Sequence, residues 1–113
     1  MERPGDRKAL ARARSLALHA QVADALERDE RLLDGARARV VRWHAEGKLH
    51  DEYARAWLAV LDAGPREVLS VLRDPGERGA TLRSVTPFTF VVSSEERARI
   101  WKRVARAWTD AAR

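Results

Sequence analysis

Residues 82–97 read L-R-S-V-T-P-F-T-F-V-V-S-S-E-E-R, and this stretch separates the last helix from the rest of the chain. A proline among aromatic and β-branched residues interrupts a sequence whose apolar residues otherwise recur at helical spacing. Because Pro87 disfavours helix at the residue before it, residues 86–92 are predicted to be extended. The stretch ends in Ser93-x-x-Glu96, the capping-box pattern that starts a helix.

Working outward from this stretch, apolar periodicity predicts helices along the rest of the chain. They cover residues 6–28, 30–46, 51–63, 65–73, 77–84 and 94–111. The third is expected to be central, because apolar residues that include Trp57 cover most of its circumference. The fold class is therefore all-α: a compact bundle of five to six helices with one extended Pro/Phe-containing segment before the last helix. Residues 1–113 are predicted to form a single domain whose residues 1–5 are frayed.

Turn and capping residues mark the predicted helix boundaries. Asp29 is expected to cap the second helix, and Gly47 to end it. Gly64 is expected to stop the third helix, and Pro65 occupies a first-turn position that tolerates a missing N–H. Residues 74–76, Asp-Pro-Gly, predict a turn before the fifth helix.

The composition excludes several classes of protein. The chain has no cysteine, so neither a disulfide framework nor a thiolate metal site can form. No apolar run approaches the roughly 18 residues of a membrane-spanning helix. The first residues lack the apolar core of a secretory signal, so a cytoplasmic protein without a membrane partner is expected.

Charge is dense and unevenly distributed. The chain carries 22 basic and 17 acidic residues, a net charge of +5. Residues 1–14 hold five basic and two acidic side chains, and residues 95–113 hold six and three, whereas residues 24–34 hold two and five. A modest basic excess permits nucleic-acid binding, but it also describes an ordinary hydrated surface of mixed charge.

His19 is the one histidine that falls within an apolar helical stripe, beside Val22 and Leu26. It is either a functional ligand or proton carrier, or a half-buried side chain that bonds a backbone carbonyl or an acid of a neighbouring element. No metal-ligand spacing, nucleophile elbow or glycine-rich phosphate loop occurs. We therefore expect no metal and no cofactor, and a small enzyme with its site at His19 is the least favoured class.

Arg97 falls at the centre of the apolar stripe that Ile100, Val104 and Trp108 form on the last helix. An arginine aimed at a core must be paired, because isolated burial of a charge is costly. It is expected to bond carbonyls of residues 86–92 as a clamp, to pair with an acid, or to contact a partner protein.

Phe88 and Phe90 alternate with Thr89, which predicts that both rings lie on one face of an extended segment. They either close over the bundle as a lid or engage another chain. Pro87 removes a backbone donor, one way of blunting a free strand edge.

The last helix also carries an exposed basic row, Arg99, Lys102, Arg103 and Arg106. This row could follow a phosphate backbone. It has no aromatic residue on its own face, however, and no helix-turn-helix pattern is visible. DNA binding is therefore possible but not favoured.

Leu82-Arg83-x-x-x-Pro87-Phe88, followed by Glu96-Arg97 and an aromatic-bearing helix, resembles a group of small bacterial proteins encoded beside toxin genes. Their segment usually reads L-R-x-x-S-P-F, with a small residue after the Phe; this chain departs from it at residues 86 and 89–90. The Leu-His pair at residues 18–19 and the Trp-containing third helix before a Gly-Pro turn are also similar, so the resemblance spans about residues 15–108.

That resemblance implies a bacterial antitoxin of a toxin–antitoxin pair, with a nucleotidyltransferase-type toxin as its partner. The leading hypothesis is a non-enzymatic protein-binding module that neutralises its toxin by direct contact. The predicted partner-binding residues are His19, Arg83, Pro87, Phe88, Phe90 and Arg97. The alternative is a transcriptional autoregulator that contacts nucleic acid through the basic row of the last helix.

Overall fold

The computed structural model describes residues 4–111, and over this range the protein is all-α, as predicted. Its elements, in chain order, are α1 (Pro4–Arg28), α2 (Leu32–Ala45), α3 (Asp51–Asp62), α4 (Pro65–Arg73), α5 (Glu77–Ser84), the 3₁₀ turn η1 (Thr89–Val91) and α6 (Ser94–Ala111). The bounds of α4, α5 and α6 agree with the sequence prediction. Helix α1 includes Pro4 and Gly5, which were expected to be frayed, and residues 1–3 lie outside the described range.

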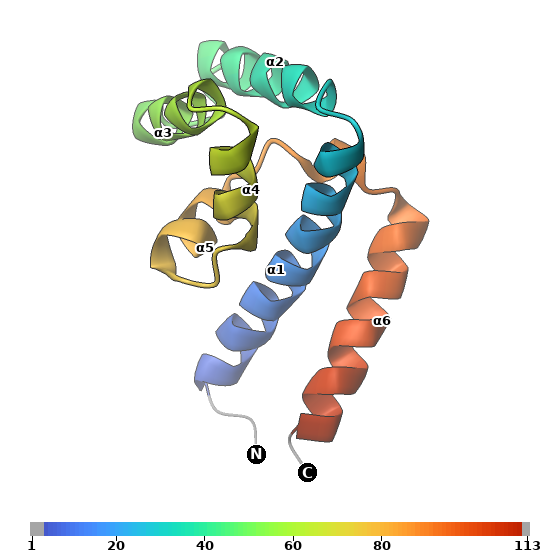
Figure 1. Cartoon of the computed structure of the whole chain (residues 1–113). Coiled ribbons are helices and arrows are strands. Elements are labelled where there is room, and N and C mark those ends of the chain that lie inside the picture. Colours follow the sequence, from blue (N-terminus) through green and yellow to red (C-terminus); the bar gives the residue numbers. More distant parts are fainter. Residues whose placement is uncertain (1–3, 112–113) are drawn as a thin grey trace.

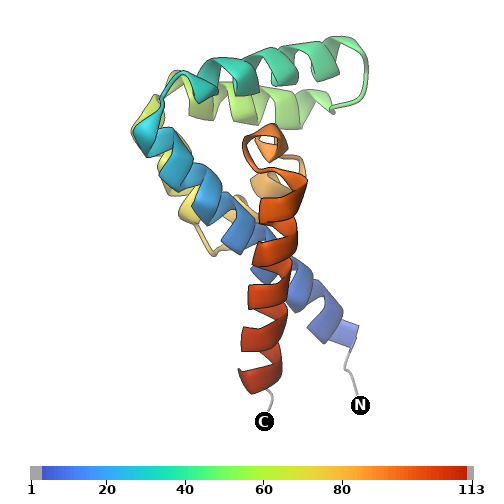
Figure 2. The same ribbon diagram turned by 90° about the vertical axis from the view of Figure 1, so that its right-hand side faces the viewer.

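Helix α1, and not α3, is the centre of the bundle, so the predicted central position of α3 is wrong. Helix α1 packs against α4 and α5 on one side and against α6 on the other (Figure 1). Helices α2 and α3 form a hairpin across one end of the molecule (Figure 2). Helix α3 also packs against α4 and α5. Apolar residues surround α3 because it lies between α2 on one face and α4 and α5 on the other.

The glycines predicted to end helices do so. Gly47 has φ 71° after α2, and Gly64 has φ 105° between α3 and α4, conformations that side chains disfavour. Asp29 does not cap α2, which begins three residues later. Its carboxylate instead accepts the backbone N–H of Arg31, 3.1 Å away, in the turn that precedes α2.

The segment between α5 and α6 is irregular and only partly extended. Residues 89–91 form the 3₁₀ turn η1, closed by a bond from the Val91 N–H to the Phe88 carbonyl (3.0 Å). The predicted capping box is confirmed. Glu96 N–H donates to Ser93 Oγ (3.1 Å), and Ser93 N–H donates to a carboxylate oxygen of Glu96 (3.2 Å). This box fixes where α6 begins and so how it lies against α1.

The core runs from the α2–α3 hairpin down the α1–α4 contact. Trp57 and Phe88 are its largest fully buried side chains, and their rings meet edge to face with centroids 5.6 Å apart. Trp57 Nε1 donates to the Leu82 carbonyl oxygen (3.0 Å), which ties α3 to the end of α5. Trp57 thereby holds both ends of residues 82–88 against the core, through the Leu82 carbonyl and the Phe88 ring.

Candidate binding site

A pocket of about 380 Å³ opens where α1, α5, the η1 segment and α6 meet. We call it the His19 pocket, after the buried histidine of α1 that lines it. Its polar lining includes Arg14 and His19 from α1, Arg83 from α5, and Arg97 from α6; Leu18 and Trp101 supply apolar surface. Three of the six predicted partner-binding residues, His19, Arg83 and Arg97, therefore meet at one place.

The His19 pocket contains unsatisfied hydrogen-bonding groups. Within residues 4–111, four buried side-chain nitrogens have no hydrogen-bond partner, and all four belong to residues that line this pocket. They are Arg14 Nε, His19 Nε2, Arg83 Nε and Arg97 Nε. Buried polar groups are nearly always satisfied in folded proteins, so the concentration of these four nitrogens distinguishes this pocket from the rest of the described residues.

His19 is held as a neutral imidazole of one tautomer. Its Nδ1 lies 2.7 Å from the Ser15 carbonyl oxygen, which can only accept, so Nδ1 carries the hydrogen. The ring is 2 % exposed, and this burial, together with the charge of Arg83, lowers its pKa to about 4. His19 thus bonds a backbone carbonyl, but one of its own helix and not of a neighbouring element as expected, and it is fully buried, not half-buried. Its Nε2 has no hydrogen-bond partner.

Arg83 has two roles. It is 3 % exposed, and its Nη1 donates to the Val71 carbonyl (3.1 Å) and to the Asp74 carbonyl, which joins α5 to the end of α4. Gly79 permits this contact, because a Cβ there would lie 2.3 Å from the Asp74 carbonyl oxygen. Burial lowers the pKa of Arg83, which the Asp74 charge partly opposes. The other edge of the guanidinium, at Nε, remains unbonded.

Arg97 does not clamp residues 86–92. Its side chain makes no hydrogen bond to the carbonyls of that segment and no ion pair with an acid of the described chain. Arg14, which lies beside it in the His19 pocket, likewise has no carboxylate partner there. Both side chains are only partly exposed. The two structural roles expected for Arg97, a clamp on residues 86–92 and a pair with an acid, are therefore absent among the described residues, and contact with a partner stays a prediction.

The two phenylalanines point in different directions, so the predicted shared face is wrong. Phe88 is fully buried against Trp57, and Pro87 is buried beside it. Phe90 is 37 % exposed; its ring packs over Gly35 of α2 and lies under the guanidinium of Arg39, 3.8 Å from the ring centroid. The 3₁₀ turn causes this divergence, because it removes the two-residue alternation of a strand.

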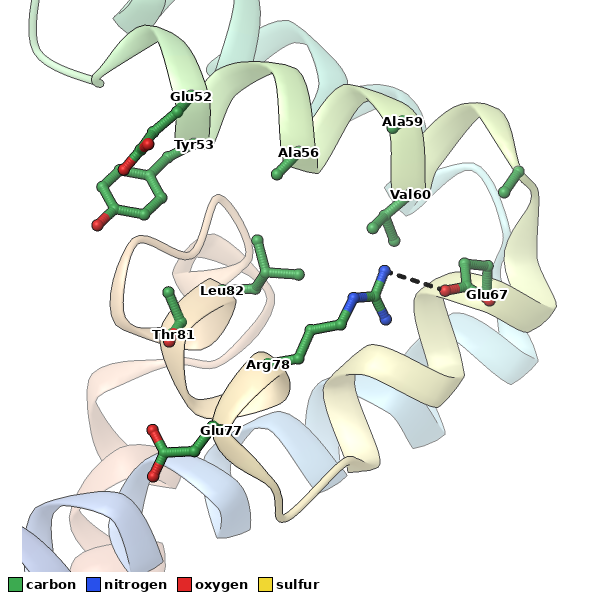
Figure 3. Close-up of a pocket in the computed structure, with 11 residues that line it drawn as sticks. Glu52, Tyr53, Ala56, Ala59, Val60, Glu67, Glu77, Arg78, Thr81 and Leu82 are labelled. Atoms are coloured by element: carbon green, nitrogen blue, oxygen red, sulfur yellow. Dashed lines mark ion pairs between the residues drawn. The ribbon is translucent and has the colours of Figure 1, made fainter.

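A second hollow, the α3–α5 groove, has about 750 Å³ and a mainly apolar floor (Figure 3). Ala56, Val60 and Leu82 contribute to the floor, and charged side chains stand at its edges. Most of those charges are paired: Arg78 lies 3.3 Å from Glu67, and the Glu77 carboxylate bonds Arg12 on α1 (2.9 Å), whereas Glu52 at the groove's edge is exposed. The α3–α5 groove therefore offers apolar surface but few free polar groups.

The basic row of α6 is exposed, as predicted: Arg99, Lys102, Arg103 and Arg106 all reach solvent. Trp101 and Val104 turn inward from the same helix and pack on the core. The row is therefore free for contact with a polyanion, but it lies outside the His19 pocket and shares none of its buried geometry.

Two further kinds of site are absent from the described part of the chain, whose side chains cover residues 7–111. No group of three or more histidine, aspartate or glutamate side chains there could hold a metal ion. No helix in this range combines the length and apolar character needed to cross a bilayer. Comparisons of the chain with protein-family models, with curated proteins and with solved structures find no match.

Arg14 is the member of the His19 pocket that sequence reasoning missed. Arg14 and Gln21 lie to one side of the apolar stripe of the first helix that includes His19, Val22 and Leu26, where polar residues are expected to meet solvent. Helix α6 covers that side, and Gln21 there donates to the Glu96 carboxylate. A signal was present, since Arg14 is four residues before Leu18 and therefore its neighbour on the helix surface.

Proposed function

We propose that this protein is a non-enzymatic, antitoxin-like binding module that neutralises a bacterial toxin by direct contact. The observation that supports this proposal best is the convergence of His19, Arg83 and Arg97 on one pocket whose buried nitrogens lack partners. These three residues belong to the predicted partner-binding set. The resemblance of the 82–97 segment to antitoxins of nucleotidyltransferase-type toxins supplies the class of partner.

The chemistry of the His19 pocket favours binding over catalysis. Guanidinium groups donate hydrogen bonds and carry fixed charge, but they do not exchange protons near neutral pH. His19 is neutral, and its Nδ1 hydrogen is committed to the Ser15 carbonyl. No serine or threonine of the pocket lies next to a carboxylate-oriented histidine, the arrangement that would activate a nucleophile.

Co-expression tests the proposed function directly. The gene adjacent to this one is expressed alone and together with the full chain, and growth is followed. We expect arrest in the first case, rescue in the second, and a stable complex by size-exclusion chromatography. Absence of both toxicity and complex formation would overturn the antitoxin assignment.

A second candidate function, nucleic-acid contact by an autoregulator, is supported by the exposed row of α6. Replacing Arg99, Arg103 and Arg106 with glutamine should leave the unfolding free energy within about 1 kcal/mol, because exposed charges contribute little. If the chain acts only by protein contact, this triple variant should still rescue growth. Loss of promoter-DNA binding with rescue intact would instead establish a separate regulatory role for α6.

A further inference from the structure

Several arginines outside the His19 pocket form ion pairs with carboxylates of the chain. Arg12 pairs with Glu77, Arg37 with Asp62, Arg55 with Asp51, Arg73 with Asp24 and Glu27, and Arg78 with Glu67. Other arginines, such as Arg28, are exposed and hydrated. Arg39 is partly exposed and has no carboxylate partner, but it donates to the Gly35 carbonyl (3.1 Å) and lies over the Phe90 ring. Arg14, Arg83 and Arg97 differ from all of these, because each has a buried Nε without a hydrogen-bond partner and no ion pair with a carboxylate of the described residues.

We propose that the His19 pocket binds one carboxylate, carried by an acidic side chain of a partner protein. The inference deepens the proposed function and rests on it only for the identity of that partner. A guanidinium presents its Nε–H and one Nη–H as a fork that matches the two oxygens of a carboxylate. In the His19 pocket, the Nε edges of three such forks are unbonded.

The size and walls of the pocket fit a single side chain. A volume of about 380 Å³ accommodates a carboxylate with its short methylene stem. Leu18 and Trp101 line it beside the arginines, so the bound carboxylate would lose part of its contact with water. Charge-assisted hydrogen bonds strengthen in such surroundings, which favours a recessed pocket over an exposed arginine as a specific contact.

A protein side chain fits this pocket better than a nucleic-acid backbone. Duplex phosphates repeat along a convex surface, and proteins meet them with rows of exposed cations. The exposed row of α6 has that form, whereas the His19 pocket is one recessed site. An acidic side chain projects from its own backbone and can enter such a recess.

His19 supplies an internal reporter for occupancy. Its Nε2 lies among Arg14, Arg83 and Arg97, the charged groups that α1, α5 and α6 contribute to the pocket. A bound carboxylate would offset these cations and stabilise the imidazolium, whose Nε2–H could then donate to it. Carboxylate binding should therefore be accompanied by a rise in the pKa of His19.

The test is a nuclear magnetic resonance titration of the full chain, following the arginine Nε–H signals and the His19 ring. The probe is the peptide N-acetyl-Gly-Glu-Gly-amide, and its Gln counterpart is the matched neutral control. Inorganic phosphate and a short DNA duplex form two further arms at constant ionic strength. The variants are Arg97→Gln and Arg14→Gln, with Arg28→Gln as the control, because Arg28 lies on α1 but is exposed.

We expect the Glu peptide to shift the Nε–H signals of Arg14, Arg83 and Arg97 saturably and to raise the pKa of His19. The Gln peptide should do neither. Losing one fork should weaken Glu-peptide binding about tenfold in each pocket variant, and Arg28→Gln should change it less than about twofold. Absence of saturable shifts, equal binding of the Gln peptide, or saturation by phosphate or DNA alone would overturn the proposal.

These outcomes are separable from the antitoxin assignment. If the Glu peptide binds but no toxin is neutralised, the carboxylate site stands and the proposed function fails. If growth rescue occurs while the peptide does not bind and Arg97→Gln rescues as well as the unchanged chain, the antitoxin assignment stands and this inference fails.

Discussion

Arg78 and Arg97 occupy contrasting surroundings in one small domain. Arg78, beside the α3–α5 groove, lies 3.3 Å from the Glu67 carboxylate, and both side chains remain in contact with water (Figure 3). Arg97 lies in the His19 pocket, with its Nε buried and unpaired among two other arginines and a neutral histidine. Around the groove Arg78 and Glu77 form ion pairs within the chain. In the His19 pocket the Nε atoms of Arg14, Arg83 and Arg97 have no partner among the described residues.

The contrast between the paired Arg78 and the unpaired Arg97 bears on whether each residue contributes to the stability of the fold. An exposed ion pair such as Arg78–Glu67 contributes at most about 1 kcal/mol. Buried charges without partners are a cost to the folded state, because water that solvated them has been removed. A cluster of them is therefore not explained by stability, and binding is the explanation that we put forward.

Substitutions in the core beside the groove and the His19 pocket should change the unfolding free energy most. Phe88→Ala should lower the unfolding free energy by about 3–5 kcal/mol, because it removes a fully buried ring that packs on Trp57. Phe90→Ala should lower it by only about 1 kcal/mol, since it loses a half-exposed ring and one contact with Arg39. Urea unfolding of both variants measures the difference. Equal losses would place both rings in the core.

Acid should weaken the His19 pocket before it weakens the ion pairs. The pKa of His19 is about 4 in the folded protein and about 6.5 when unfolded, so the unfolded chain binds the extra proton between these values. The contribution of neutral His19 to the unfolding free energy is fully present above pH 6.5 and is lost as the pH falls towards 4. It amounts to about 3 kcal/mol.

Urea unfolding at a series of pH values checks the histidine prediction. His19→Asn, whose amide can replace the Nδ1–H donor, should flatten the slope between pH 6.5 and 4.5. His50→Gln serves as the control, because His50 is exposed at the start of α3. The carboxylates of Asp29, Glu77 and Glu96 have pKa values lowered by their bonding partners, so their loss of stability falls at lower pH. An unchanged slope in His19→Asn would contradict this assignment.

Arg83 bonds backbone carbonyls within the fold through Nη1 and also has an unpaired Nε in the His19 pocket. Its replacement should lower the unfolding free energy by less than that of Phe88. Arg83→Met removes the donor to the Val71 and Asp74 carbonyls and leaves these acceptors buried. The unfolding free energy should fall by about 2–3 kcal/mol, the cost of losing charged hydrogen bonds. Thermal unfolding of this variant beside Arg97→Met separates the structural arginine from the unpaired one; matching melting temperatures would remove the distinction.

Local chemistry made much of the fold predictable. The Ser93–Glu96 capping box, the glycines at residues 47 and 64, and Pro65 each fix a helix end through contacts within a few residues. The central helix was not predictable in this way. Which helix covers which is decided by packing between distant segments, and α6 covers a face of α1 that local periodicity assigned to solvent.

The candidate site was predictable in part for the same reason. His19 and Arg97 stood out because each interrupts an apolar stripe on its own helix. Arg14 did not stand out, because its burial depends on α6, and the Phe88–Phe90 prediction failed because a 3₁₀ turn replaced the expected strand. Sequence periodicity identifies the unusual residue on one element, whereas the meeting of four such residues is a property of tertiary structure.

The claim that Arg14 and Arg97 await a partner is tested most directly by the unfolding free energies of Arg14→Met and Arg97→Met. Arg73→Met is the reference, because Arg73 is exposed and paired with Asp24 and Glu27. Replacing an arginine whose Nε is buried and unpaired with an apolar side chain should leave stability unchanged or raise it by about 1 kcal/mol, while the reference loses up to about 1 kcal/mol. A loss above about 2 kcal/mol in both pocket variants would instead mean that these arginines hold the fold together.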